Sequence, residues 1–266
     1  MWTPSVPART PNIIVVSGAE HFEALLNAPS QRPFFAFINL MEPHSPYVDG
    51  PHFDQFETQP ELDVDRNDLQ DFFMGRVQFG EDELARLRDR YDSEILFADE
   101  IVGQLIDELE RRGLLDDTVL VVTSDHGEHF GEHDLVDHVF NIYEGNVRIP
   151  LMIRYPRILA PGKVNDAPIQ LHDIFPTLLS LTGNAEAIDS MRIQGQDASD
   201  PDSLDAMRPL ILSYGYPLQV LQSFGEDHDA PRLAPYRRRL WGMREGNMKI
   251  ILGDDGSVEV YDLGAD

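Results

Sequence analysis

The clearest pattern in the sequence is a stripe of apolar residues between residues 81 and 112. They recur at steps of three and four, the spacing of one helix face; the members are Leu84, Leu87, Tyr91, Ile95, Ala98, Val102, Leu105 and Leu109. Acidic residues stand at the start, and Arg111, Arg112 and Gly113 stand at the end. These charges suit the helix dipole and the glycine suits a helix stop. The stripe therefore predicts one long helix over residues 81–112.

Short apolar runs bounded by proline, glycine or polar residues predict buried strands. These runs cover residues 12–16, 33–40, 118–123 and 148–155. The third run, TVLVVT, follows the long helix and is typical of a β-α-β unit in a parallel sheet. The segment DIFPTLLSL predicts a short helix over residues 173–181, with Pro176 in its first turn. Residues 47–80 show no hydrophobic period, which predicts a long irregular segment between the regular elements. Together these elements predict an α/β fold.

The pattern changes again beyond residue 208. Short β-type runs follow one another there, and they read LILSYG, RLWGMRE, MKIIL and VEVYDL. A turn at residues 253–256 separates the last two, so we expect a small antiparallel sheet. Lys249 lies within MKIIL at a position that suits a surface lysine, and we assign it no role.

The composition narrows the set of partners. The chain has 47 acidic and 21 basic residues, a formal net charge of −26, and 42% apolar residues. The apolar share favours a packed globule, and the charge would repel nucleic acid and anionic membranes. Such acidity with few lysines suits an intracellular, cytoplasmic protein of a halophile, because concentrated salt screens self-repulsion. No secretion signal or membrane-spanning run is visible. The absence of cysteine excludes disulfides, thiolate metal sites and a cysteine nucleophile.

Candidate chemistry follows directly after the TVLVVT strand. Asp125 and His126 are two types of metal ligand, and Gly127 permits a sharp turn beside them. The alternative is an acidic turn with a solvated histidine. Two features favour the metal site: its position at the carboxyl end of a strand, and a second histidine cluster. That cluster contains His129, His133 and His138.

Several motifs in order resemble the sulfatases of the alkaline phosphatase superfamily. They are a strand followed by His-x-Pro-Tyr (PFFAFINLMEPHSPY), the long helix, SDHGE, GEH, YE-x-x-x-R-x-P, DIFPTLL and the tail VEVYDLGAD. The resemblance covers residues 33–266. It implies a three-layer α/β/α fold with a mostly parallel sheet of alkaline phosphatase/sulfatase type, partial in this chain. We expect this α/β domain over residues 1–205 and a small antiparallel β subdomain over residues 206–266.

The resemblance also implies roles for individual residues. Asp125 and His126 would be ligands of a divalent metal, calcium in the first place, with magnesium, manganese or zinc as alternatives. His44 would contact the sulfate or protonate the leaving oxygen. His138 occupies a position where many relatives have a sulfate-binding lysine, and a histidine is cationic only when protonated. The implied substrate is a sulfate ester of a small molecule or a glycan.

The remaining motif residues receive structural roles. We expect Glu132 and His133 to be turn residues that orient their neighbours, and Arg148 to form a structural ion pair. Ser5 begins a Ser-x-Pro-x-Arg match to the family's nucleophile motif, but a β-type run follows it where the family has a helix. We interpret that match as coincidence. Asp125 and His126 alone cannot fill the six to eight positions of a calcium ion, so we expect this chain by itself to be inactive or nearly so.

Three functions stay open at this point. The first is sulfuric ester hydrolysis by the protein with its nucleophile. The second is phosphodiester hydrolysis or phosphoryl transfer, because the superfamily shares the metal-site geometry. The third is a non-catalytic remnant that persists as a binding module.

Overall fold

The computed structural model describes residues 12–17, 33–58, 64, 66–200, 204–225 and 230–265. The Ser5 motif lies outside these residues. The chain forms two compact units. Unit 1 contains the described residues of Met1–Asp65 and Glu81–Gly113, and unit 2 contains those of Arg66–Gly80 and Leu114–Asp266. The predicted boundary between residues 205 and 206 stays a prediction.

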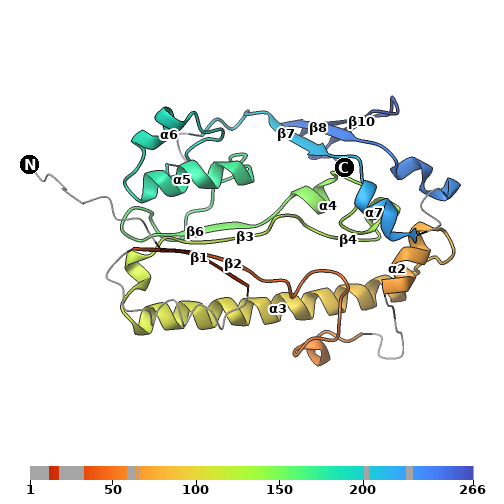
Figure 1. The fold of residues 1–266 in the computed structure, drawn as a ribbon, viewed down its shortest axis with the longest axis horizontal. Coiled ribbons are helices and arrows are strands. Elements are labelled where there is room, and N and C mark those ends of the chain that lie inside the picture. The colour runs from red at the N-terminus through yellow and green to blue at the C-terminus, as the bar shows by residue number, and fades with distance from the viewer. Residues whose placement is uncertain are drawn as a thin grey trace, which may run out of the picture. The chain divides into compact units, whose positions relative to one another are not determined.

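The long helix of unit 1 is α3, Glu81–Arg111, drawn in yellow in Figure 1. The helix predicted from the apolar stripe is therefore confirmed. Leu87 and Leu109 on the stripe are each 2% exposed, and burial of a leucine contributes about 1.5–3 kcal/mol. At the end of the helix Glu108 accepts hydrogen bonds from Arg111 and Arg112. Gly113 then takes a positive φ of 67°, which stops the helix.

The two predicted strands near the start of the chain are also confirmed. They are β1, Asn12–Ser17, and β2, Phe34–Asn39. The two strands pair in parallel, with Asn12 opposite Phe34 and Ser17 opposite Asn39. Among the described strands this two-stranded sheet is the one with parallel pairing.

Part of the segment without a period folds onto α3. Its short 3₁₀ helix η1, Phe53–Gln55, lies against α3, and the Arg86 guanidinium lies 4.1 Å from the centre of the Phe53 ring. Arg90 donates from Nε to Asp49 at 2.7 Å and from its guanidinium to the carbonyl of Val64. Both arginines are at most 7% exposed. Paired buried arginines therefore hold this loop where sequence periodicity gave no signal.

Unit 2 begins with a helix that the sequence pattern did not predict, α2, Arg66–Phe73. Phe73 at its end is 4% exposed. Its ring makes edge contacts with Phe140 at 5.3 Å and Tyr236 at 5.8 Å between ring centres. Because the helix has little more than two turns, its packing against distant aromatic residues stabilises it more than its own periodicity does.

The strands that lead to the candidate chemistry are β3, Leu120–Thr123, after the 3₁₀ helix η2, Leu115–Asp117, and β6, Leu151–Arg154. Both confirm predicted strands in shorter form. They pair antiparallel, with Thr123 opposite Leu151, so the parallel neighbour expected for β3 is not seen among the described strands. Between them lie β4, His129–Phe130, the 3₁₀ helix η3, Glu132–Asp134, β5, Val136–Asp137, and α4, Glu144–Val147.

The predicted short helix is α5, Ile174–Leu181, which follows the 3₁₀ helix η4, Leu171–Asp173, and precedes α6, Glu186–Met191. Pro176 lies in the first turn, as expected. Asp173 at its start is 1% exposed. Its carboxylate accepts hydrogen bonds from the amides of Gln170 and Gln196 and from both guanidinium nitrogens of Arg208.

The predicted C-terminal antiparallel sheet is confirmed. Its strands are β7, Leu210–Tyr214, β8, Leu240–Glu245, β9, Met248–Gly253, and β10, Val258–Asp262. The spatial order is β10-β9-β8-β7, and the helices α7, Leu218–Ser223, and η7, Pro231–Tyr236, lie between β7 and β8 in the chain. Leu240 and Ile251 on the inner face pack with Ile142 in a buried cluster.

The surface position expected for Lys249 is wrong. Lys249 is 2% exposed, because the alternation of β9 places it on the same inner face as Ile251. Its Nζ donates to the Ile142 carbonyl at 2.6 Å and to Glu144 at 2.7 Å. The buried ammonium therefore joins the sheet to Glu144 of α4.

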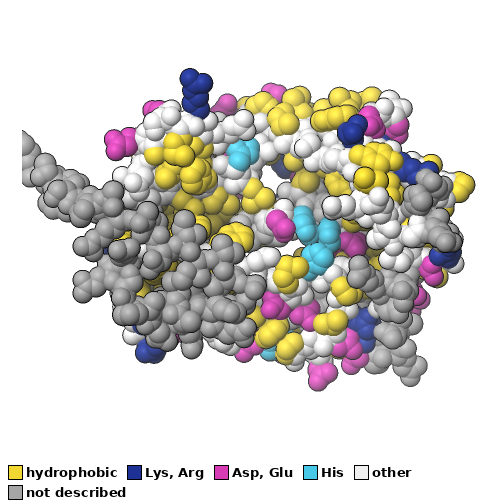
Figure 2. All heavy atoms as spheres, viewed as in Figure 1, with side chains coloured by type: hydrophobic (Ala, Val, Ile, Leu, Met, Phe, Trp, Pro, Cys, Tyr) yellow, Lys and Arg dark blue, Asp and Glu magenta, His cyan; other side chains and the backbone are white. Residues whose placement is uncertain are grey.

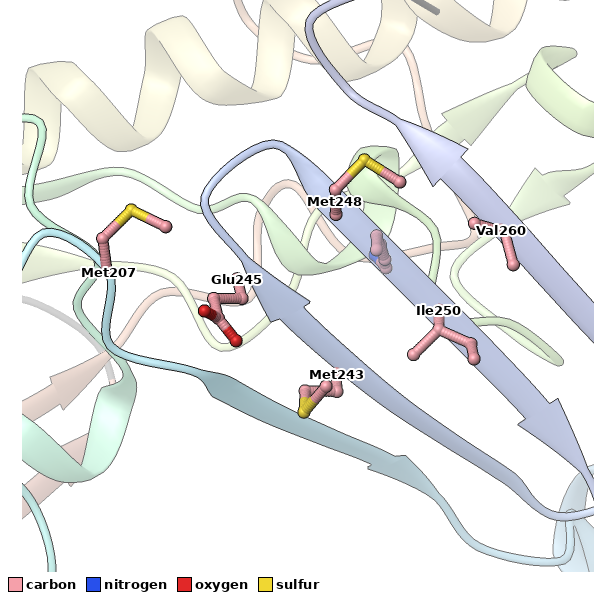
Figure 3. A pocket seen from close by; sticks show the side chains of 7 residues that line it. Met207, Met243, Glu245, Met248, Ile250 and Val260 are labelled. Atoms are coloured by element: carbon pink, nitrogen blue, oxygen red, sulfur yellow. The ribbon is translucent and has the colours of Figure 1, made fainter.

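The outer face of this sheet is apolar. Ile211, Met243, Ile250 and Val260 lie opposite one another in a row across the four strands. Figure 2 shows hydrophobic side chains along the upper edge of the view, where Figure 1 draws β7, β8 and β10. A hollow of about 350 Å³ opens on this face, lined by β8, β9, β10 and Met207 (Figure 3). Among the described helices, none has an apolar stretch long enough to cross a bilayer.

Candidate metal and anion site

The loop after β3 presents Asp125 and His126 together. Nδ1 of His126 lies 2.9 Å from the Gly127 carbonyl, so the ring uses Nδ1 as donor and leaves Nε2 as the ligand atom. That Nε2 lies 3.7 Å from Oδ1 of Asp125. Two ligands of one cation at about 2.0–2.5 Å are separated by a similar distance. The two residues therefore fit a divalent metal with mixed nitrogen and oxygen ligands.

A glycine is required after this pair. A Cβ on Gly127 would lie 2.1 Å from the carbonyl oxygen of Gly145, well inside contact distance. The Gly127 amide donates to the Asn146 carbonyl at 2.7 Å. The loop that carries Asp125 and His126 thus lies backbone to backbone against α4, and we call residues 124–128 the metal loop.

His138 lies beside the metal loop. Its ring stacks on that of His126, with ring centres 4.1 Å apart and an angle of 25° between the planes. Within unit 2 the structure therefore brings together Asp125, His126 and His138. His44 lies in unit 1, where its amide donates to the Met41 carbonyl and its exposed ring lies 2.5 Å from the Ser45 carbonyl.

Two carboxylates face Nδ1 of His138. Asp137 lies 2.8 Å away and Glu128 lies 3.2 Å away. Burial lowers the pKa of His138, but the hydrogen bonds and negative charges of Asp137 and Glu128 outweigh it and raise that pKa to about 10. The environment thus favours the cationic imidazolium. Sequence reasoning missed both carboxylates, although Glu128 belongs to the SDHGE motif and Asp137 directly precedes His138.

The other two histidines of the second cluster have structural surroundings. His129 is fully buried, its Nε2 lies 3.1 Å from Oδ1 of Asn141, and burial lowers its pKa. His133 has a positive φ of 55° and stacks on Tyr143 with ring centres 3.9 Å apart. Glu132 accepts a hydrogen bond from the Phe130 amide at 2.7 Å. The turn roles expected for Glu132 and His133 agree with these contacts.

The ion pair expected for Arg148 is not formed with any described residue of unit 2. Its side chain is exposed, and its amide donates to the Glu144 carbonyl at the end of α4. The charged residues that do fix α4 are Lys249 and Arg244, which bind the two carboxylate oxygens of Glu144 at 2.7 and 2.9 Å.

Comparison with known proteins identifies relatives of this chain. The family model described as Sulfatase matches residues 17–184. Choline-sulfatase of Rhizobium meliloti (strain 1021) is 37% identical over 254 residues, which cover 89% of this chain and 45% of that protein. The chain therefore spans less than half the length of this curated relative.

Solved structures are similar as well. One, a complex with its substrate D-glucosamine-2-N,6-O-disulfate, is 28% identical with a TM-score of 0.55, and the match covers 73% of this chain and 38% of that one. A phosphonate monoester hydrolase from Silicibacter pomeroyi is 22% identical with a TM-score of 0.65, over 93% of this chain and 53% of that one. The second likeness shows the fold alone, and it confirms the α/β architecture predicted from the sequence.

Proposed function

Because this chain belongs to the sulfatase family of the alkaline phosphatase superfamily, we propose that it supplies part of the active site of a metal-dependent sulfuric ester hydrolase. In this proposal Asp125 and His126 bind the metal, His138 binds the sulfate, and His44 contacts the sulfate or protonates the leaving oxygen. The family membership rests on a model match over residues 17–184.

The observation that supports the proposal best is the grouping at the metal loop. Asp125 and His126 offer an oxygen and a nitrogen 3.7 Å apart, and His138 stacks directly on His126. Asp125 and His126 would hold a metal cation next to the positively charged ring of His138, and an anion could then bind to the metal and to His138 at the same time.

Each group has a defined chemical task. A bound divalent metal would supply Lewis-acid stabilisation of the sulfate oxygens. His138 donates a hydrogen bond to the same anion, with its charge supported by Glu128 and Asp137. His44, when protonated, gives a proton to the oxygen that leaves. Calcium is the first choice of metal, and magnesium, manganese and zinc are the alternatives, because the carboxylate suits magnesium and manganese and the imidazole suits zinc.

The proposed substrate is a sulfate ester of a small molecule or a glycan. Support comes from the names of similar proteins: a choline-sulfatase at 37% identity and a structure bound to a disulfated glucosamine at 28% identity.

We also propose that this chain by itself is inactive or nearly so. Two protein ligands leave most positions of a calcium ion to water. The chain matches 45% of the length of the choline-sulfatase, so we propose sulfate-ester turnover for a protein that also carries the nucleophile and the other metal ligands.

The test is an aryl sulfate assay on the product of the whole gene, with calcium present and after chelation. Asp125→Ala should lower kcat/KM at least about 100-fold, since it removes a metal ligand. Asp189→Ala is the matched control, because Asp189 is an exposed aspartate on α6. Absence of turnover in the wild-type protein, or full activity of the Asp125 variant, would contradict the proposal.

Two other functions are tested by the same protein. Faster turnover of a phosphate diester than of the sulfate ester would favour the phosphodiesterase alternative, which the histidine at position 138 keeps open. A non-catalytic binding module is favoured if DNA upstream of Met1 encodes no in-frame strand ending in paired aspartates and no Cys/Ser-x-Pro-x-Arg motif.

A further inference from the structure

The short helix α4 contacts both loops of the candidate site. Asn146, its third residue, accepts the Gly127 amide at 2.7 Å through its backbone carbonyl. Its side-chain Nδ2 donates to the His138 carbonyl at 2.8 Å and to the Asn141 carbonyl at 3.4 Å. One buried residue, 7% exposed, thus bonds to the metal loop on one side and to the segment of His138 on the other.

The backbone around this residue is closely packed and leaves no space for a side chain at two glycines. A Cβ on Gly127 would collide with the Gly145 carbonyl, and a Cβ on Gly145 would lie 2.7 Å from the His129 ring. The helix is fixed in turn by Glu144, which accepts hydrogen bonds from Lys249 and Arg244 of the C-terminal sheet. A shift of Asn146 must therefore displace a loop rather than be absorbed by α4.

From this geometry we propose that Asn146 is a positioning residue, which sets the spacing of His126 and His138 by bonding to both of their loops. The inference rests on the proposed function, in which these two histidines bind metal and sulfate. Asn146 acts only through Gly127 and the backbone of segment 138–141.

The test compares two asparagines whose side-chain Nδ2 donates to a backbone carbonyl. Asn146→Asp keeps the size of the side chain but turns an oxygen toward the carbonyls of His138 and Asn141, so attraction becomes repulsion. Asn184→Asp is the matched control, because Nδ2 of Asn184 also donates to a backbone carbonyl, that of Thr182, at an exposed site. Asn146→Ala, which removes the amide without adding charge, replaces the first variant if that variant does not fold.

Two measurements at constant pH are made on the 266-residue chain. Proton NMR of the histidine Cε1–H groups reports the stacking of His126 on His138, because each ring shifts the signals of the other. Titration with Mn²⁺ reports metal binding, because bound Mn²⁺ broadens the His126 signal. This broadening is sensitive enough to detect weak binding. We expect Asn146→Asp to shift both histidine signals and to raise the Mn²⁺ concentration needed for half-broadening about tenfold or more. Asn184→Asp should change neither.

A purely structural role would lower thermal stability and leave both readouts unchanged. The inference is wrong if a folded Asn146 variant keeps the wild-type histidine signals and a Mn²⁺ response within twofold of wild type. If the wild-type His126 signal does not respond to Mn²⁺, the proposed metal role fails, while the histidine shifts still decide the role of Asn146.

Discussion

Replacement of the buried Asp173 should destabilise unit 2 strongly. Its carboxylate is 1% exposed and accepts four hydrogen bonds, from Gln170, from Gln196 and twice from Arg208. Asp173→Asn keeps one oxygen and turns an amide toward donors that need an acceptor. It also leaves Arg208, whose side chain is 12% exposed, without its counter-charge. Removing one partner of a buried ion pair costs about 3–5 kcal/mol, and we expect a loss of this size.

The same carboxylate gives the sign of a pH effect. Burial alone would raise the pKa of Asp173, but the hydrogen bonds from Arg208, Gln170 and Gln196 outweigh burial and lower it. The folded pKa thus lies below the unfolded one of about 3.9. The stabilisation is complete above the unfolded pKa and is lost as the pH falls through the folded pKa. The stability difference between wild type and Asp173→Asn should therefore shrink in acid.

The assay is urea unfolding followed by circular dichroism, at pH 7 and at pH values below about 4. Arg208→Lys is measured alongside, because it keeps the charge but loses the two-pronged contact, at a smaller cost of about 1–2 kcal/mol. This variant also covers the case in which Asp173→Asn does not fold. A loss below about 1 kcal/mol for Asp173→Asn at pH 7, or a difference that widens in acid, would refute the reasoning.

Three further predictions concern other parts of the chain. Gly127→Ala should weaken Mn²⁺ binding at least about tenfold, because its Cβ would meet the Gly145 carbonyl. The control Gly103→Ala lies in α3 with open space around its Cβ, and it should instead raise the free energy of unfolding by about 0.5–1 kcal/mol. Equal Mn²⁺ titrations for wild type and Gly127→Ala would contradict the prediction for Gly127. Lys249→Met should lower the free energy of unfolding by about 1–3 kcal/mol, since it leaves the buried Ile142 carbonyl without its donor; urea unfolding measures it, and an unchanged midpoint would count against a structural role for the ammonium. The midpoint of thermal unfolding should rise between 0.1 M and 1 M KCl, because the Debye length falls from about 10 Å to about 3 Å and screens the net charge of −26; a midpoint that falls with KCl would argue against the interpretation of a salt-adapted protein.

Local periodicity was sufficient for the regular elements. The stripe that begins at Leu84 predicted α3 nearly to the residue, and the alternating runs after residue 208 predicted the four-stranded sheet. The short helix α2 was missed, because its stability comes from Phe73 packing on distant aromatic rings rather than from a long repeat. Lys249 was placed on the surface by residue type, although its spacing from Ile251 already indicated the inner face.

By itself, the sequence determined the type of fold, the position of Asp125 and His126 after a strand, and the family. The order of the motifs and the chemistry of their residues can be read directly from the sequence. The tertiary structure alone decided which side chains contact one another. Glu128 and Asp137 pair with His138, Asn146 bonds to the His138 segment and the metal loop, and Lys249 binds Glu144 from the inner face of the sheet. The Lys249 bonds join residues up to 107 positions apart, and even nearby groups such as Glu128 and His138 meet only because of how the chain folds back, which no local pattern records.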